Sequence, residues 1–73
     1  MNKIDEVVKI IQEIAPFENI TKDTELVESE ILDSLGLIKL VSSLEDTFNI
    51  SLDIDKLVPE NLKTAEIITK KLL

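Results

Sequence analysis

The chain has neither cysteine nor histidine, so a domain built from its 73 residues must be stable without disulfides and without a cysteine- or histidine-based metal site. Domains of this size usually need efficient helix packing, a structural metal or disulfide bonds to be stable. The missing cysteines exclude disulfides and a cysteine-based metal site. Apolar residues make up 44% of the sequence, which is enough for a small core and argues against disorder of the whole chain. We therefore expect one domain that spans residues 1–73.

The spacing of apolar residues predicts two helices in the first part of the chain. Residues 3–14 repeat apolar side chains at helical intervals, and Pro16 marks the end of that helix. A second helix is expected over residues 34–48, with Asp33 as its N-cap and Asn49 as its C-terminal stop. The two apolar faces consist of Ile4, Val7, Val8, Ile11 and Ile14, and of Leu37, Leu40, Val41, Leu44 and Phe48, with Ile38 on the edge of the second face.

The last third of the chain is predicted to hold a short helical turn and a final helix. Asp53 or Asp55 can cap a turn that reaches residues 57–58 and ends at Pro59. The final helix should begin after Thr64, and its apolar residues are Ala65, Ile67, Ile68 and Leu72. No segment alternates in the manner of a strand. The sequence therefore predicts an all-α fold, a four-helix bundle with three main helices and one short helix.

The connection between the first two helices, residues 16–33, is long and acidic. A connection of this length without a regular period is unusual in a compact domain and is often functional. Its scattered apolar residues, which we expect to pin it to the core, are Phe17, Ile20, Leu26, Ile31 and Leu32. Its charged residues are Glu18, Asp23, Glu25, Glu28, Glu30 and Asp33 against Lys22 alone.

The net charge of −7, from 15 acidic residues and 8 lysines, limits the class of partner. A polyanion repels nucleic acid and anionic lipid, and it attracts proteins with basic patches. No apolar run approaches the roughly 20 residues that span a membrane, and the first residues do not read as a signal peptide. We expect a cytoplasmic monomer that binds other proteins, with no nucleic acid and no membrane span.

Few residues could support catalysis or metal binding. Without histidine the chain lacks the commonest general base and the usual partner of a nucleophilic serine. Glu45 and Asp46 are adjacent on a helix and do not face each other, so they are not a catalytic pair. The acidic connection lacks the ligand pattern of an EF-hand. We predict no catalytic residue and no metal site.

Ser34 is the residue best placed to carry chemistry. It stands in the first turn of a predicted helix, where backbone N–H groups and the helix dipole suit a phosphate. Leu35 follows it and points away from the apolar face, so an exposed leucine beside an exposed serine suggests a docking point. Asp-Ser pairs are also common at helix starts without any further role, and these residues alone leave that reading open.

The sequence around Ser34 resembles the modification motif of acyl and peptidyl carrier proteins. The resemblance lies in Ile31-Leu32-Asp33-Ser34-Leu35-Gly36, with residues 20–26 similar to the loop that enters the motif and residues 44–50 similar to the end of the second helix. It implies that a phosphopantetheinyl transferase, using coenzyme A and magnesium, attaches 4′-phosphopantetheine to Ser34. The thiol of that arm would hold a cargo as a thioester. The protein, itself non-catalytic, would present the cargo to loading enzymes and synthases that recognise its second helix.

Two residues depart from the fatty-acid branch of this family. Gly36 stands where that branch usually has aspartate, and glycine there is typical of peptidyl, D-alanyl and some specialised carriers. Lys39 stands where that branch has glutamate, so it either weakens pairing with basic partners or contacts a neighbouring acid on its own helix. The residues expected to recognise partners are Asp33, Leu35, Lys39, Ser42 and Asp46.

The resemblance favours a free-standing acyl or aminoacyl carrier in a specialised pathway, such as polyketide or nonribosomal peptide biosynthesis. The runner-up within the family is a housekeeping fatty-acid carrier. The alternative from another class is an unmodified acidic adaptor that binds partners through its second helix.

Overall fold

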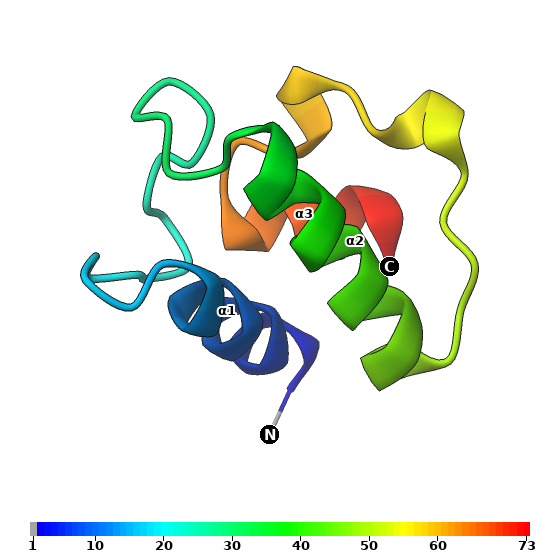
Figure 1. The fold of residues 1–73 in the computed structure, drawn as a ribbon. Coiled ribbons are helices and arrows are strands. Elements are labelled where there is room, and N and C mark those ends of the chain that lie inside the picture. Colours follow the sequence, from blue (N-terminus) through cyan, green and yellow to red (C-terminus); the bar gives the residue numbers. More distant parts are fainter. Residues whose placement is uncertain (1) are drawn as a thin grey trace.

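The computed structural model describes residues 2–73, which form three α-helices and two short 3-10 helices. The elements are α1 (Lys3–Ile14), α2 (Ser34–Phe48), η1 (Ile54–Lys56), η2 (Pro59–Asn61) and α3 (Ala65–Leu72). α1 packs against both α2 and α3, while the α1–α2 connection and the α2–α3 link run on opposite sides of the helices (Figure 1). The predicted all-α architecture is confirmed. Of the helices in the described part of the chain, none combines the length and apolar character needed to cross a membrane.

Polar caps fix the helix ends at the predicted places. The Asp33 carboxylate accepts the backbone N–H of Gly36 at 2.7 Å, and the Thr64 hydroxyl accepts that of Ile67 at 3.1 Å. Asn49 ends α2 in the left-handed conformation, with φ 53° and ψ 52°, which asparagine tolerates better than most residues. These caps satisfy N–H and C=O groups that a helix end would otherwise leave without a partner.

The short helical turn between α2 and α3 is formed by two 3-10 helices instead of one. Asp53 rather than Asp55 caps η1, because the Asp53 carboxylate accepts the N–H of Asp55 at 3.0 Å. Pro59 does not simply end the turn, as the sequence predicts, but begins η2. Its missing N–H and fixed φ suit the first position of a helix, so one proline both ends one turn and starts another.

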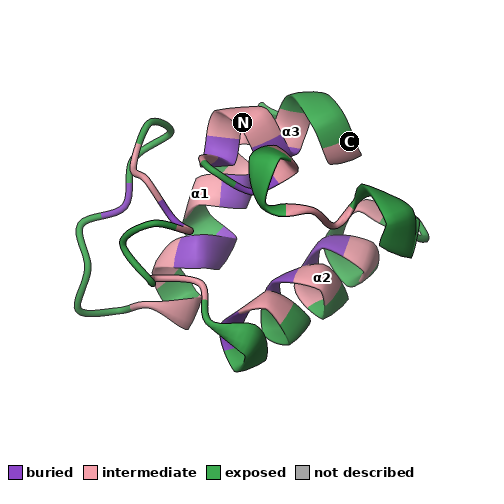
Figure 2. Ribbon diagram, turned by 90° about the horizontal axis from the view of Figure 1, so that it is seen from above, coloured by how far each residue is buried: buried purple, intermediate pink, exposed green. Residues whose placement is uncertain are grey.

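The core lies where the α-helices face one another, as the buried positions in Figure 2 show. Its members are Val7, Ile10, Ile11, Ile20, Leu26, Leu40, Leu44, Leu62, Ala65 and Ile68. The predicted face of α1 omits Ile10, which the structure buries because α1 packs against two helices at once. In the described residues no polar or charged residue is buried, so burial of apolar area is the main stabilising contribution.

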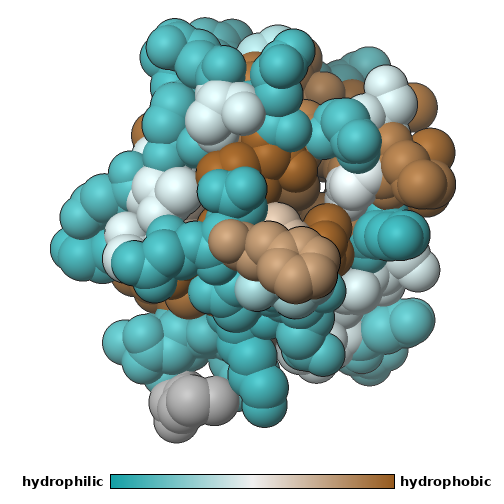
Figure 3. Space-filling view, turned by 60° about the vertical axis from the view of Figure 1, so that its left-hand side comes forward, coloured by the Kyte–Doolittle hydropathy of each residue, from teal (hydrophilic) through white to brown (hydrophobic). Residues whose placement is uncertain are grey.

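The α1–α2 connection is pinned to the core at a few points. Ile20 and Leu26 are buried, and the Leu26 N–H donates to the carbonyl of Lys63 at 2.8 Å. Gln12 in α1 accepts the Ile20 N–H at 3.1 Å. Phe17 does not help to pin the connection to the core, contrary to the prediction. It stands in the turn directly after α1 and is 99% exposed. Figure 3 views this side, where hydrophilic side chains cover most of the face and apolar ones gather near its centre.

Added salt should raise the melting temperature of the protein. The chain carries a net charge of −7, and the one ion pair in the described residues joins Lys22 and Glu66 at 3.7 Å. Acids crowd the α1–α2 connection and the end of α2, so screening their repulsion stabilises the folded state. A relief of about 1 kcal/mol would raise Tm by roughly 4–8 °C. Thermal melts from low to moderate potassium chloride, and with added magnesium, measure this; a flat or falling Tm contradicts it.

Candidate functional site

Ser34 begins α2 and is exposed to solvent. The preceding residue, Asp33, holds the first turn: its carbonyl accepts the N–H of Leu37 at 2.8 Å, and its carboxylate accepts the N–H of Gly36 at 2.7 Å. An N-cap of this kind typically contributes about 1 kcal/mol. Because Asp33 fixes the start of the helix, the Ser34 hydroxyl has no capping role. A partner enzyme can therefore reach the hydroxyl without disturbing the fold.

The backbone at Ser34 suits a covalently bound phosphate group. N–H groups in the first turn of a helix lack intrahelical acceptors, and the helix dipole favours an anion there. A phosphodiester on the Ser34 hydroxyl would lie in solvent at this end of α2, where no buried charge is created. The described residues contain no group of three or more potential metal ligands of the Asp, Glu, His or Cys type.

Gly36 lies beside the end of α1 in the first turn of α2. The residue is buried, and a Cβ added to it would lie 3.1 Å from the Asp33 Oδ1 and 3.7 Å from the Cγ2 of Ile14. The first distance is tighter than most side-chain contacts, so the Asp33 carboxylate would have to shift by a few tenths of an ångström to admit a Cβ, whereas the second is an ordinary van der Waals contact. From the sequence, Gly36 is notable only as a departure from the fatty-acid branch. In the structure the residue lies between the Asp33 cap and Ile14 of α1.

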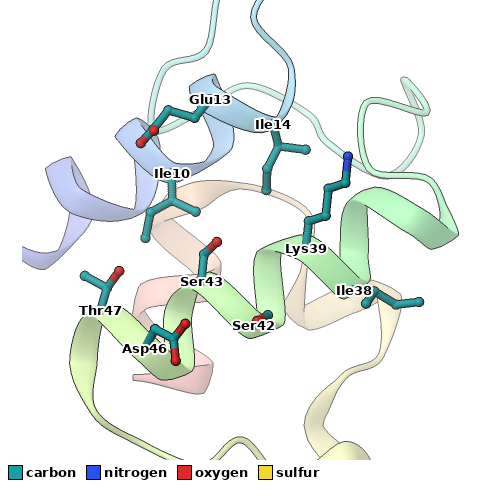
Figure 4. Close-up of a pocket in the computed structure, with 9 residues that line it drawn as sticks. All are labelled: Ile10, Glu13, Ile14, Ile38, Lys39, Ser42, Ser43, Asp46 and Thr47. Carbon is teal, nitrogen blue, oxygen red and sulfur yellow. The ribbon is translucent and has the colours of Figure 1, made fainter.

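The five residues predicted to recognise partners are all exposed, but they fall into two groups. Lys39, Ser42 and Asp46 line a groove of about 660 Å³ between α1 and α2 (Figure 4). Asp33 and Leu35 border a smaller hollow of about 160 Å³ at the start of α2, and Lys39 lines this hollow too. The predicted stripe is therefore continuous along one side of α2, with Lys39 at the junction of its two parts.

Lys39 makes no ion pair in the described part of the chain, where Lys22 and Glu66 form the only one. The alternative prediction, a contact with a neighbouring acid, is therefore not observed. Positions three and four residues from Lys39 hold Leu35, Gly36, Ser42 and Ser43, none of which is charged. The ammonium group is available to a partner.

A second groove lies on the other side of α2, and sequence reasoning missed two of its residues. Ile38 was expected at the edge of the buried face, but it is 66% exposed. Ile54, in η1, is 79% exposed. Both line a mainly apolar groove of about 440 Å³, whose other members are Leu37, Val41, Leu57 and the polar Ser42 and Glu45. Helical spacing could have indicated Ile38, but no local pattern shows that the α2–α3 link brings Ile54 beside α2.

Leu37 points inward as predicted, yet it is only partly buried. It lines the open groove and also a smaller cavity of about 160 Å³ that Val27, Leu32 and Leu62 help to enclose. Leu57 lines both spaces as well. The two leucines therefore lie between the groove and the smaller cavity, while Leu40 and Leu44 are fully buried in the core.

Comparisons with known proteins agree with this geometry. A family model described as a phosphopantetheine attachment site matches residues 5–68. The solved structure of a protein from Mycobacterium tuberculosis, assigned as an acyl carrier protein, superposes with a TM-score of 0.76 at 28% identity, over 96% of this chain and 93% of that one. No curated protein matches the sequence. The predicted resemblance is confirmed: the chain belongs to the phosphopantetheine-attachment family, whose covalently bound cofactor is 4′-phosphopantetheine.

Proposed function

We propose that this chain is a non-catalytic carrier that holds an acyl or aminoacyl cargo as a thioester on a 4′-phosphopantetheine arm attached to Ser34. The position of Ser34 carries the proposal: its hydroxyl is exposed at the capped start of α2, inside the matched residues 5–68. The arm, when bound, supplies the thiol that forms the thioester. In this proposal residues 1–73 act as one carrier domain.

Attachment of the arm requires one reactive atom of this chain, the hydroxyl oxygen of Ser34. The Ser34 Oγ forms a bond to the phosphorus of coenzyme A that carries the pantetheine part. The bond from that phosphorus to the bridging oxygen breaks, and adenosine 3′,5′-bisphosphate leaves. The hydroxyl proton goes to a base on the transferase, since the adjacent Asp33 carboxylate is engaged with the N–H of Gly36. Asp33 keeps the first turn rigid, and the helix N-terminus favours the phosphodiester anion.

A specialised or aminoacyl pathway, in preference to housekeeping fatty-acid synthesis, is supported by two features. The stretch 34–44 contains no acid and one cation, Lys39, so the part of α2 nearest Ser34 does not match a strongly basic partner. Leu37 and Leu57 limit the inner cavity to about 160 Å³, which leaves little room for a long acyl chain. The charge of this stretch favours partners that are not strongly basic. The size of the cavity favours a small cargo.

The proposal is tested by arming the protein and then loading it. The chain is incubated with coenzyme A, magnesium and a broad-specificity phosphopantetheinyl transferase, and its intact mass is measured. We expect the mass of one arm to be added. The armed protein is then offered to a panel of adenylation enzymes and acyltransferases, and a cargo bound as a thioester should be released by hydroxylamine. A protein that never gains the arm would instead be an unmodified adaptor, and loading only by fatty-acid enzymes would indicate the housekeeping carrier.

A further inference from the structure

The α1–α2 groove of about 660 Å³ combines apolar and polar side chains (Figure 4). Its volume lies in the range of small-molecule sites. Ile10 and Ile14 of α1 contribute apolar surface, and the hydroxyl groups belong to Ser42, Ser43 and Thr47 of α2. The attachment of an arm leaves this groove without a role, although it runs along the helix that Ser34 begins.

The charged side chains of the α1–α2 groove are one cation and two acids. Lys39 lies toward the start of α2 and also lines the hollow beside the Asp33 cap. Glu13 belongs to α1 and Asp46 to α2, so the two carboxylates come from facing helices (Figure 4). Asp46 follows Lys39 by seven residues, about 10 Å along the helix axis. The one ion pair in the described residues lies outside the groove, so no protein cation neutralises either acid.

An arm on Ser34 is long enough to bring its cargo to these acids. Ile38 and Ser42 line both the α1–α2 groove and the groove beside η1, so an arm can pass from one groove to the other over this shared ridge. From the serine oxygen to the sulfur the arm is about fourteen bonds long, which equals roughly five extended residues or about 17 Å. Asp46 follows Ser34 by twelve residues, about 18 Å along the helix axis. A group attached to the sulfur therefore reaches the Asp46 carboxylate.

The order of polar groups along the α1–α2 groove fits the arm and an amino acid joined to it. The pantetheine part has a hydroxyl and two amides, which can form hydrogen bonds with the Lys39 ammonium group and the hydroxyls of Ser42 and Ser43. An amino acid loaded through its carboxyl group keeps a free ammonium group beside the thioester. Asp46 offers it a carboxylate, and Glu13 adds negative charge from the facing helix. An uncharged acyl group gains nothing from either acid and suits the mainly apolar groove beside η1 better.

We propose that the α1–α2 groove holds the arm together with an aminoacyl cargo, and that Asp46 and Glu13 recognise the ammonium group of that cargo. The inference rests on the proposed function, because the arm must be attached to Ser34. It narrows the cargo from an acyl or aminoacyl group to an amino acid bound through its carboxyl group. Both acids are exposed, so their effect on the ammonium group is modest and is screened by salt.

The test compares two cargoes of nearly the same shape, one of which has a methyl group in place of the ammonium group. The ¹⁵N-labelled protein is armed by a broad-specificity phosphopantetheinyl transferase with the alanyl or the isobutyryl derivative of amino-coenzyme A, whose amide link resists hydrolysis. Intact mass verifies arming, and backbone amide chemical shifts are then compared with those of the protein that carries the arm alone. The alanyl cargo should change the shifts of Ser43, Asp46 and Thr47 about three- to tenfold more than the isobutyryl cargo does at low ionic strength, and added salt should reduce this difference.

Two variants remove one charge each with little change of shape. Asp46→Asn and Glu13→Gln should each lower the alanyl-induced shifts of Ser43 and Thr47 about two- to fivefold. Glu60→Gln is the matched control, since Glu60 is an exposed acid in η2 that lines neither groove, and it should leave these shifts as they are in wild type. Thermal melts verify that each variant is folded.

The outcomes separate this inference from the proposed function. Equal shifts for the two cargoes would overturn it while the carrier function stands, and so would alanyl-induced shifts confined to Ile54 and Leu57 of the groove beside η1. An equal loss for Glu60→Gln would also overturn it, because the effect would then come from the net charge of the chain and not from the two acids of the groove. If wild type gains no arm from either derivative or from coenzyme A, the proposed function fails and the inference fails with it.

Discussion

Replacing Ser34 by alanine should abolish attachment of the phosphopantetheine arm. Alanine has no hydroxyl to form the phosphodiester, so the intact mass after incubation with coenzyme A and the transferase should stay that of the unmodified chain. Every function that depends on the thiol would be lost with the arm. The fold should be unaffected, because Ser34 is exposed and Asp33 makes the capping hydrogen bond. An exposed change away from the core typically alters stability by about 0.5 kcal/mol or less.

Other exposed serines provide matched controls for this prediction. Ser42 lies on the same helix and lines the α1–α2 groove, and Ser51 lies in the link after α2. Neither stands at a helix N-terminus or follows a capping aspartate. Ser42→Ala and Ser51→Ala should therefore gain one arm, like wild type. Arm attachment to the Ser34→Ala variant, or a wild type that stays unmodified, would show that the attachment point is wrong.

The helices could be predicted from the sequence because their determinants are local. Apolar spacing placed α1 and α2 within their observed bounds, and side-chain caps were readable at Asp33 and Thr64. Ser34 stood out for the same reason: its neighbours in the sequence and its position at a helix start are both local features. Local rules succeed here because each cap bonds to a backbone group only a few residues away.

The parts that could not be predicted depend on contacts between distant segments. Ile54 belongs to the groove only because the α2–α3 link returns alongside α2. Gly36 is close to Ile14, which precedes it by the whole length of the α1–α2 connection. Ile38 sits one residue from Leu37, about 100° around the helix, and only the direction of packing decides which of the two is exposed. Phe17 shows the converse case, an apolar residue that no distant segment covers.

These long-range contacts also explain why the two sides of α2 differ. One side faces α1 across a groove lined by Glu13, Asp46 and hydroxyl groups (Figure 4). The other faces η1 across a groove lined mainly by apolar residues. Ser34 begins the helix that both grooves share. Glu45 is the one acid among the residues that line this second groove, so the two sides of α2 offer a partner different surface chemistry.

Truncating a core leucine of α2 should cost far more stability than truncating an exposed one. Leu44 and Leu35 are nine residues apart, so about 900° of rotation places them on opposite sides of the helix. Leu44 is fully buried, and Leu44→Ala should destabilise the fold by about 2–5 kcal/mol through lost burial and a residual cavity. Small domains have little stability to lose, so this variant should be largely unfolded or melt far below wild type.

Leu35→Ala, in contrast, should change the free energy of unfolding by about 0.5 kcal/mol or less, because most of that side chain is already in water. Leu37→Ala should fall between the two, since Leu37 is only partly buried. Thermal and urea melts give the order, and transferase kinetics supply a second readout that stability does not determine. In the melts Leu35→Ala should behave like wild type. In the transferase kinetics it should gain the arm more slowly, because an apolar contact beside Ser34 is lost. The interpretation of α2 as a helix with one core face and one docking face would be wrong if Leu35→Ala destabilised the protein as much as Leu44→Ala. It would be equally wrong if Leu35→Ala were armed at the wild-type rate.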